Sequence, residues 1–261
     1  MFQKHVVVEN LLNLTSNELN LLAQDKHKII AANWKMNGSE TLLNDFATYK
    51  PKKNNEIIMC LPFTLLTSAK AILPNFIKIG AQNCSNEDSG AFTGETSASM
   101  LRERSVTHVI VGHSERRILF NETDLMISKK VELLLKNELT PIICIGETLS
   151  EKKDKKTLQV LEKQIDSSLT NMRADMQLIV AYEPLWAIGT GLVPSDSEIT
   201  ETHSYIKEKL GQIFNTNISV LYGGSANAEN CIKITSIDNV DGLLVGGASL
   251  KKHDFITICN C

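Results

Sequence analysis

Short apolar runs recur along this chain at nearly regular intervals, and this repetition limits the possible folds more than any other feature. The eight runs are Ile29–Asn33, Glu56–Leu61, Ile77–Gln82, His108–Gly112, Pro141–Gly146, Leu178–Glu183, Ile218–Gly223 and Gly242–Gly246. They are nearly continuous in apolar residues, which is typical of parallel strands covered on both faces. Segments with helical spacing, such as Asp124–Lys136 and Lys155–Ser168, lie between most of them. We therefore predict eight β-α units of about 30 residues each.

Eight parallel units without a break in composition favour one closed structure. We predict an α/β fold, a single-domain, eight-stranded parallel (β/α)8 barrel that covers residues 29–261. The alternative is an open, doubly wound sheet. It has less support, because no G-x-G-x-x-G motif opens a helix after the first run.

Residues 1–28 precede the first predicted strand and read as an N-terminal extension. Thr15 and Glu18 have the spacing of a capping box, so a short helix is expected from about Ser16 to Ala23. A start codon assigned too early would also explain the segment, and the sequence leaves both readings open. Polar residues interrupt its apolar stretch and no cleavage site follows, which argues against a secretory signal.

Composition excludes several classes of function. The net charge of −3 predicts no basic face for nucleic acid. No apolar run approaches the roughly 20 residues of a membrane span. The six cysteines are scattered and form no C-x-x-C motif, so we expect reduced thiols in a cytoplasmic protein rather than a disulfide framework or a zinc site.

The sixth run ends in a carboxylate that a loop follows at once. Pro184 cannot donate to a sheet ladder, so the strand must stop beside Glu183. The loop that follows is apolar and glycine-rich, and could close over Glu183 and exclude water. A charged residue that only caps a strand before a surface loop is the alternative reading. The residues of this predicted lid are Pro184, Leu185, Trp186, Ala187, Ile188, Gly189, Thr190 and Gly191.

Other strand ends carry residues suited to chemistry. In a barrel of this kind, catalytic groups gather at the carboxyl ends of the strands. Asn33 and Lys35 follow the first run, and His113 and Glu115 follow the fourth. Singly, each could be a solvated or paired surface residue. His108 and His113 lie five residues apart without a helical H-E-x-x-H pattern, so no metal site is predicted.

Two glycine loops, Tyr222–Ser225 and Gly246–Ser249, follow the seventh and eighth runs. Barrels often bind phosphate with these two loops, where backbone N–H groups point at the anion. A single glycine pair is more often a plain turn. Two such loops at these strand ends favour a phosphate site.

Together these segments resemble the triosephosphate isomerase family over about residues 29–261. The motifs that carry the resemblance are Asn33–Gly38, Gly80–Asn83, Gly90–Glu95, Gly112–Arg117, Cys144–Glu147, Tyr182–Gly191, Tyr222–Ser225 and Leu244–Leu250. The resemblance implies a TIM barrel that interconverts dihydroxyacetone phosphate and D-glyceraldehyde 3-phosphate in glycolysis and gluconeogenesis. It implies no cofactor and no metal.

The same resemblance implies the roles of the site residues. This family is itself a standard case of a glutamate base beside a neutral histidine under a closing loop, so these roles come with the resemblance. Glu183 would be the base, and His113 would polarise the carbonyl. Lys35 and Asn33 would stabilise the enediolate, and Glu115 would position the lysine and histidine. The residues expected to hold the phosphate are Gly189, Ser225, Gly246 and Gly247.

The resemblance further implies a homodimer. The long loop Ser85–Glu95 would reach a second copy of the chain, with Thr93 supporting the partner's active site. Two departures from the family are visible besides the extension. The first crossover, Ser39 to Asn55, is a few residues short, so its helix should be clipped. Leu192, Val193 and Pro194 replace the usual end of the lid.

Two rival functions share part of this pattern. A sugar-phosphate epimerase would have the glycine loops without needing the lid together with Asn33, Lys35, His113 and Glu183. A non-catalytic barrel would be expected to lack one of those four residues, and all four are present.

Overall fold

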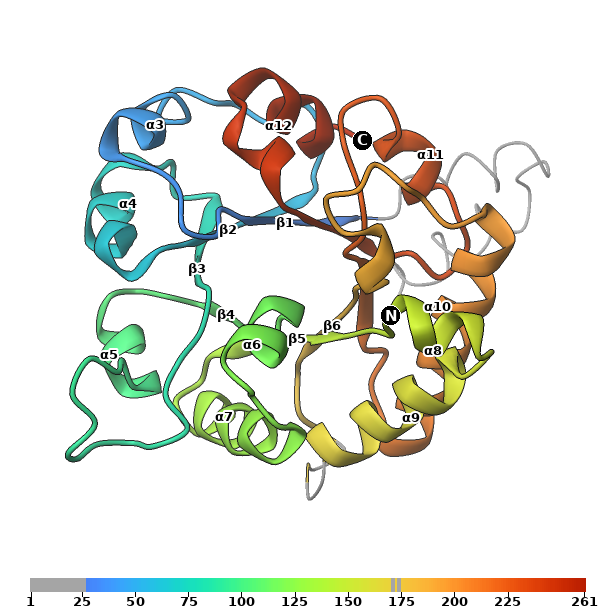
Figure 1. Cartoon of the computed structure of the whole chain (residues 1–261). Coiled ribbons are helices and arrows are strands. Elements are labelled where there is room, and N and C mark those ends of the chain that lie inside the picture. The colour runs from blue at the N-terminus through green and yellow to red at the C-terminus, as the bar shows by residue number, and fades with distance from the viewer. Residues whose placement is uncertain (1–26, 170–171, 173–174) are drawn as a thin grey trace, which may run out of the picture.

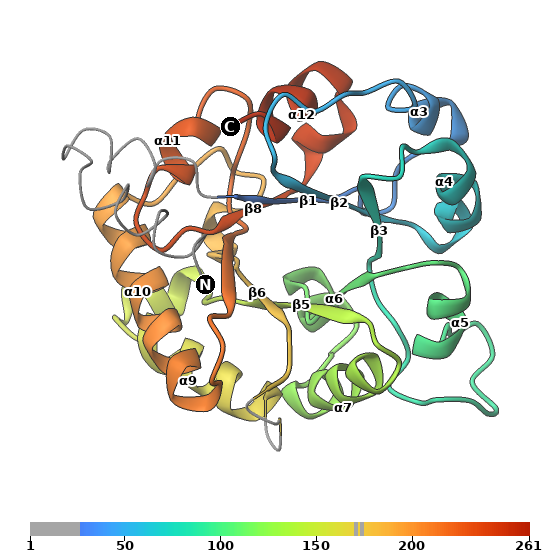
Figure 2. The same ribbon diagram turned by 180° about the vertical axis from the view of Figure 1, so that it is seen from behind.

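The computed structural model describes residues 27–169, 172 and 175–261, which form a closed barrel of parallel strands (Figure 1). The strands are β1 (Ile29–Asn33), β2 (Glu56–Leu61), β3 (Ile77–Ala81), β4 (His108–Val111), β5 (Thr140–Ile145), β6 (Ile179–Tyr182), β7 (Ser219–Tyr222) and β8 (Gly242–Val245). Each bound lies within one residue of the predicted run. Strand β8 pairs with β1, as Figure 2 shows from behind. The barrel prediction is confirmed, and the open sheet is excluded.

Helices surround the strands on the outside of the barrel (Figures 1 and 2). The α-helices are α3 (Glu40–Asn44), α4 (Leu66–Ile72), α5 (Ala98–Glu103), α6 (Ser114–Leu119), α7 (Asp124–Lys136), α8 (Leu149–Lys153), α9 (Thr157–Ser168), α10 (Asp196–Ile213), α11 (Cys231–Thr235) and α12 (Lys252–Cys259). Short 3-10 helices are η1 (Phe63–Leu65), η2 (Leu185–Ala187) and η3 (Gly247–Leu250). Among the described helices, none combines the length and the apolar character needed to cross a membrane.

The strands bury both of their faces, which explains their continuous apolar sequences. Ile29 and Ala31 belong to the cluster that fills the barrel interior, whereas Ile30 and Ala32 belong to the cluster beneath the helices. This alternation follows from the two-residue period of a strand. The interior is a packed core rather than a pore.

Of two predictions about helices, the structure confirms one and corrects the start of the other. The clipped first helix is confirmed, because α3 spans five residues and begins at the N-cap Ser39. The helix expected over Lys155–Ser168 begins later, at Thr157. Lys155 has a φ of +58°, a left-handed conformation that cannot continue a helix.

The expectation that all cysteines are reduced is wrong. Cys231 and Cys261 form a disulfide, while Cys60, Cys84, Cys144 and Cys259 are free and buried. Cys231 begins α11 and Cys261 ends the chain, and Figure 1 shows the C-terminus beside α11. Spacing along the sequence did not indicate this pair, because 30 residues separate the two cysteines and the fold brings their Cα atoms to 6.2 Å.

We expect the disulfide to contribute measurably to stability. Closing a loop of 30 residues restricts the unfolded chain and stabilises the fold by roughly 3.6 kcal/mol. Dithiothreitol should therefore lower the urea midpoint of the wild-type protein. A Cys231→Ser variant, which cannot form the disulfide, is the matched control. Dithiothreitol should leave the urea midpoint of this variant unchanged. Equal wild-type midpoints with and without reductant would contradict the expectation.

The predicted helix Ser16–Ala23 lies outside the described residues.

Candidate active site

The two residues expected to do most of the chemistry meet at the carboxyl end of the barrel. Glu183 follows β6, and His113 is the N-cap of α6 just after β4. The Nε2 atom of His113 lies 3.1 Å from Oε1 of Glu183. The backbone N–H of Ser114 donates to Oε2 of Glu183 over 3.1 Å. The two side chains are almost fully buried, so water is largely excluded from the pair.

The Glu183 side chain needs the glycine that follows β7. A β-carbon at Gly223 would lie 2.9 Å from Cγ of Glu183, closer than real β-carbons approach another atom. Any side chain at Gly223 would therefore displace the carboxylate. This contact gives a packing reason for one of the glycines that the sequence analysis assigned only to phosphate binding.

Each member of the pair changes the pKa of the other. Burial opposes ionisation of Glu183, but His113, the Ser114 N–H and Lys35 outweigh it and lower the pKa of the carboxyl group. Burial also opposes protonation of His113, yet the charge of Glu183 outweighs it and raises the pKa of the imidazole. The Glu115 N–H donates to Nδ1 of His113 over 3.2 Å, so we assign the ring proton to Nε2, facing Glu183.

Lys35 adopts an unusual backbone conformation beside this pair. Its φ of +53° costs on the order of 1–3 kcal/mol for a non-glycine residue, and such strain clusters at functional sites. Its Nζ lies 2.5 Å from Oε1 of Glu115, and its backbone N–H donates to Oδ1 of Asn33 over 3.0 Å. Glu115 also lies 3.7 Å from Nδ1 of His113. One carboxylate thus contacts both the lysine and the histidine.

The expected phosphate-binding residues are only partly assembled. Gly246 faces Lys35, because a β-carbon there would lie 3.7 Å from the lysine Cε, and Gly247 begins η3. Ser225 instead donates to the carbonyl of Ala187 in the lid over 2.5 Å. Gly189 has a φ of +66°, and no described atom lies within 4 Å of its β-carbon position. The first glycine loop is therefore joined to the lid at Ala187, whereas the β-carbon position of Gly189 faces open space.

The base of the lid is anchored by Glu147, a residue to which the sequence analysis assigned no role. Trp186 lies in η2 and donates its indole N–H to Oε1 of Glu147 over 2.9 Å. The hydroxyl of Tyr182 also donates to Glu147, over 3.2 Å. Burial raises the pKa of Glu147, although these donors oppose the shift. The sequence did contain a signal for Glu147. It is a carboxylate just after β5, as Glu183 is a carboxylate just after β6.

Thr93 does not join the site of its own chain. It lies on the loop between β3 and α5, which projects from the barrel in Figures 1 and 2. Thr93 and Phe92 are exposed. At the base of the loop, the N–H of Ser85 donates to the carbonyl of Thr96 over 2.8 Å.

Two further features bear on where chemistry takes place. Within the described residues, no group of three or more His, Cys, Asp or Glu side chains could hold a metal ion.

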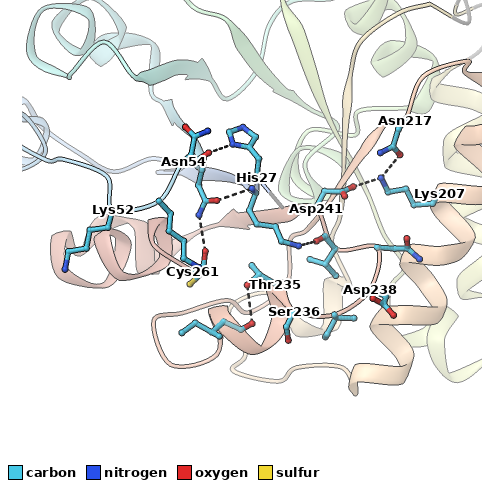
Figure 3. A pocket seen from close by; sticks show the side chains of 17 residues that line it. His27, Lys52, Asn54, Lys207, Asn217, Thr235, Ser236, Asp238, Asp241 and Cys261 are labelled. Atoms are coloured by element: carbon cyan, nitrogen blue, oxygen red, sulfur yellow. Dashed lines mark hydrogen bonds and ion pairs between the residues drawn. The ribbon is translucent and has the colours of Figure 1, made fainter. Parts of the chain in front are cut away.

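A cavity of about 1090 Å³ lies at the opposite end of the barrel, among residues that precede the strands (Figure 3). Lys207 and Asp241, which line it, already pair over 2.5 Å. None of the expected site residues lines this cavity.

A closed parallel barrel with ionisable groups gathered at the carboxyl ends of its strands defines an enzyme of the (β/α)8-barrel class. A family model described as triosephosphate isomerase matches residues 28–261. The chain belongs to the triosephosphate isomerase family.

Curated relatives agree with this assignment. A triosephosphate isomerase of Alkaliphilus metalliredigens is 43% identical over 243 residues, which cover 89% of this chain and 98% of that protein. That of Alkaliphilus oremlandii is also 43% identical, with the same coverage. That of Bartonella henselae is 40% identical over 241 residues, which cover 88% of this chain and 95% of that protein.

Proposed function

We propose that Glu183 is the base of the family's reaction, the interconversion of dihydroxyacetone phosphate and D-glyceraldehyde 3-phosphate. This is an intramolecular aldose–ketose isomerisation. The observation that carries the proposal is the buried Glu183 carboxylate, 3.1 Å from His113 at the carboxyl end of the barrel. The lowered pKa keeps Glu183 ionised and able to take a proton from a substrate carbon. An enediolate intermediate would form and receive the proton back on the adjacent carbon.

His113 and Lys35 stabilise that enediolate. The Glu183 charge is what raises the pKa of His113, so the ring loses this support for a second proton once Glu183 has turned toward carbon. His113 is then neutral, and its single proton on Nε2 can be donated to a substrate oxygen. The Glu115 N–H on Nδ1 supports this tautomer. Lys35 offsets the negative charge of the intermediate and the phosphate, and Asn33 is a further donor at the substrate oxygen. Glu115 positions both Lys35 and His113. The scheme requires no cofactor.

The phosphate is held by the glycine loops and the lid. Backbone N–H groups of Gly246, Gly247 and Ser225 would bind the phosphate, with Gly246 lying beside Lys35, and Gly189 would join them when the lid closes. Closure of Pro184–Gly191 excludes water, which strengthens the electrostatic interactions around the intermediate.

A second copy of the chain completes the site. The projecting Ser85–Glu95 loop carries the exposed Phe92 and Thr93, and in a two-fold dimer it inserts beside Asn33 and Lys35 of the partner. Met36, next to Lys35, is 96% exposed and offers an apolar contact for it. We place this homodimer in the cytoplasm because the family's reaction serves glycolysis and gluconeogenesis, although a disulfide such as Cys231–Cys261 is uncommon there.

A coupled assay on the purified full-length chain tests the proposed reaction. Dihydroxyacetone phosphate formed from glyceraldehyde 3-phosphate is reduced by a dehydrogenase, and loss of NADH absorbance reports the rate. We expect rapid turnover in both directions. A ketopentose phosphate serves as the control substrate, since its epimerisation without triose phosphate turnover would indicate the rival epimerase.

We expect the residues before β1 to be dispensable for catalysis, as the proposed domain boundary at residue 29 requires. A chain that begins at Lys26 retains every strand-end residue of the site and should keep its turnover number. Steady-state kinetics of the truncated and full-length proteins provide the comparison. A truncated protein that folds but is inactive would show that the extension reaches the site.

A further inference from the structure

The base of the lid is held by a cation as well as by Glu147. Lys152, on α8, places its Nζ 3.8 Å from the centroid of the Trp186 ring. A cation over the face of an indole is attracted by the negative charge density of the ring. The edge of the same indole donates to Glu147. The two ends of one short segment, residues 147–152, thus hold both the edge and the face of Trp186.

The same ammonium reaches the helix that follows the lid. Lys152 Nζ lies 2.6 Å from Oε1 of Glu198, in the first turn of α10. The other carboxylate oxygen of Glu198 accepts from the N–H and the hydroxyl of Ser195, each over 2.8 Å. Ser195 is the N-cap of α10 and directly follows Leu192, Val193 and Pro194, the three residues that join the exit of the Pro184–Gly191 lid to this helix.

We propose that Lys152 is a positioning residue that ties the two ends of the lid to one point of the barrel. The contacts run from Trp186 at the entry of the lid, through Lys152 and Glu198, to Ser195 at its exit. The proposal rests on the proposed function, in which Pro184–Gly191 closes over the phosphate. It assigns to Lys152 no contact with substrate.

The charge distribution supports this arrangement. The Lys152 ammonium, together with the Ser195 N–H, lowers the pKa of Glu198 to about 2, so the carboxylate is ionised throughout the physiological range. The Lys152 side chain is 29% exposed, which leaves its charge only partly screened by water. The charge that Glu198 brings to the bridge therefore does not change with pH in that range.

Without this bridge, the entry of the lid would gain freedom. Closing the lid would then cost more conformational entropy, and fewer closures would bring Gly189 to the phosphate. We expect Lys152→Met, which keeps the aliphatic stem, to lower kcat/KM about three- to tenfold, the range that a cation on an indole face contributes. Inhibition by inorganic phosphate should weaken by a similar factor.

Matched variants separate this role from a general effect of charge. Lys153→Met removes the adjacent, exposed ammonium from the same helix and should leave both constants unchanged. Lys152→Arg keeps a cation that can stack on the indole and should restore most of the loss. Glu198→Gln should reduce kcat/KM in the wild-type background and have no further effect in Lys152→Met, because the bridge is already broken.

The fluorescence of Trp186 gives a readout that does not require turnover. The other tryptophan, Trp34, is fully buried and contributes a constant background. Lys152→Met should increase quenching by acrylamide, whereas Lys153→Met should not. If Lys152→Met and Lys153→Met give the same kinetics and the same quenching, the proposal is wrong. A wild-type protein without triose phosphate turnover would contradict the proposed function, while quenching would still decide whether Lys152 holds Trp186.

Discussion

Turnover should fall by on the order of 100-fold when Glu183 is replaced by aspartate. The substitution keeps the charge but withdraws the carboxylate by one methylene, and a misplacement of about 1 Å can cost roughly 10²-fold in rate. Glu183 is buried and held by two contacts, from His113 and from the Ser114 N–H, so the shorter side chain cannot regain its position by moving in solvent.

Steady-state kinetics in both directions measure this effect, and thermal unfolding verifies that the variant is folded. Glu103→Asp, at the exposed end of α5, is the matched control and should behave as the wild type. We expect the loss mainly in kcat, because the carboxylate acts on carbon in the transition state. Turnover of Glu183→Asp near the wild-type level would rule out Glu183 as the base.

Shortening the projecting loop should separate the proposed dimer and remove most of the activity. Residues 86–95 are replaced by a short glycine turn, while Ser85 and Thr96, which close the base of the loop, are kept. Lys35 would then lose the partner's support. Because its strained backbone depends on its surroundings, displacement on the order of 1 Å could again cost about 10²-fold.

Analytical ultracentrifugation and kinetics of the same sample decide this prediction. Phe92→Asp leaves the loop length unchanged and should weaken the dimer less severely, since Phe92 is 46% exposed in the single chain. Leu125→Asp also replaces an exposed apolar side chain with aspartate, but on α7, and should leave the proposed dimer intact. A loop-shortened protein that remains a dimer, or a fully active monomer, would refute the coupling.

The positions of the strands could be predicted from the sequence because their cause is local. A strand buried on both faces needs a continuous apolar run, and Glu56–Leu61 satisfies this requirement without reference to any other part of the chain. The end of β6 was equally local, since Pro184 cannot donate to a sheet ladder. The family motifs then indicated the candidate site residues, which all lie at or just beyond strand ends or in the loops that follow them.

Contacts between side chains could not be predicted in this way. Ser114 and Glu183 are 69 residues apart, and Lys35 and Glu115 are 80 residues apart. Their meeting depends on the closure and register of the barrel, which bring the ends of non-adjacent strands to one face. Cys231–Cys261 was missed for the same reason, because the pair joins a helix between two strands to the end of the chain.

The residues around the lid show most clearly which features follow from consecutive residues and which follow only from the tertiary structure. The sequence by itself determined that a carboxylate, a proline and a flexible apolar loop follow β6, since these are properties of consecutive residues. Only the tertiary structure decided what holds that loop, because Glu147 and Lys152 reach Trp186 from the loop and helix after β5. A hydrogen bond and a cation–ring contact depend on distance and orientation in space, and neither leaves a periodic pattern in the chain.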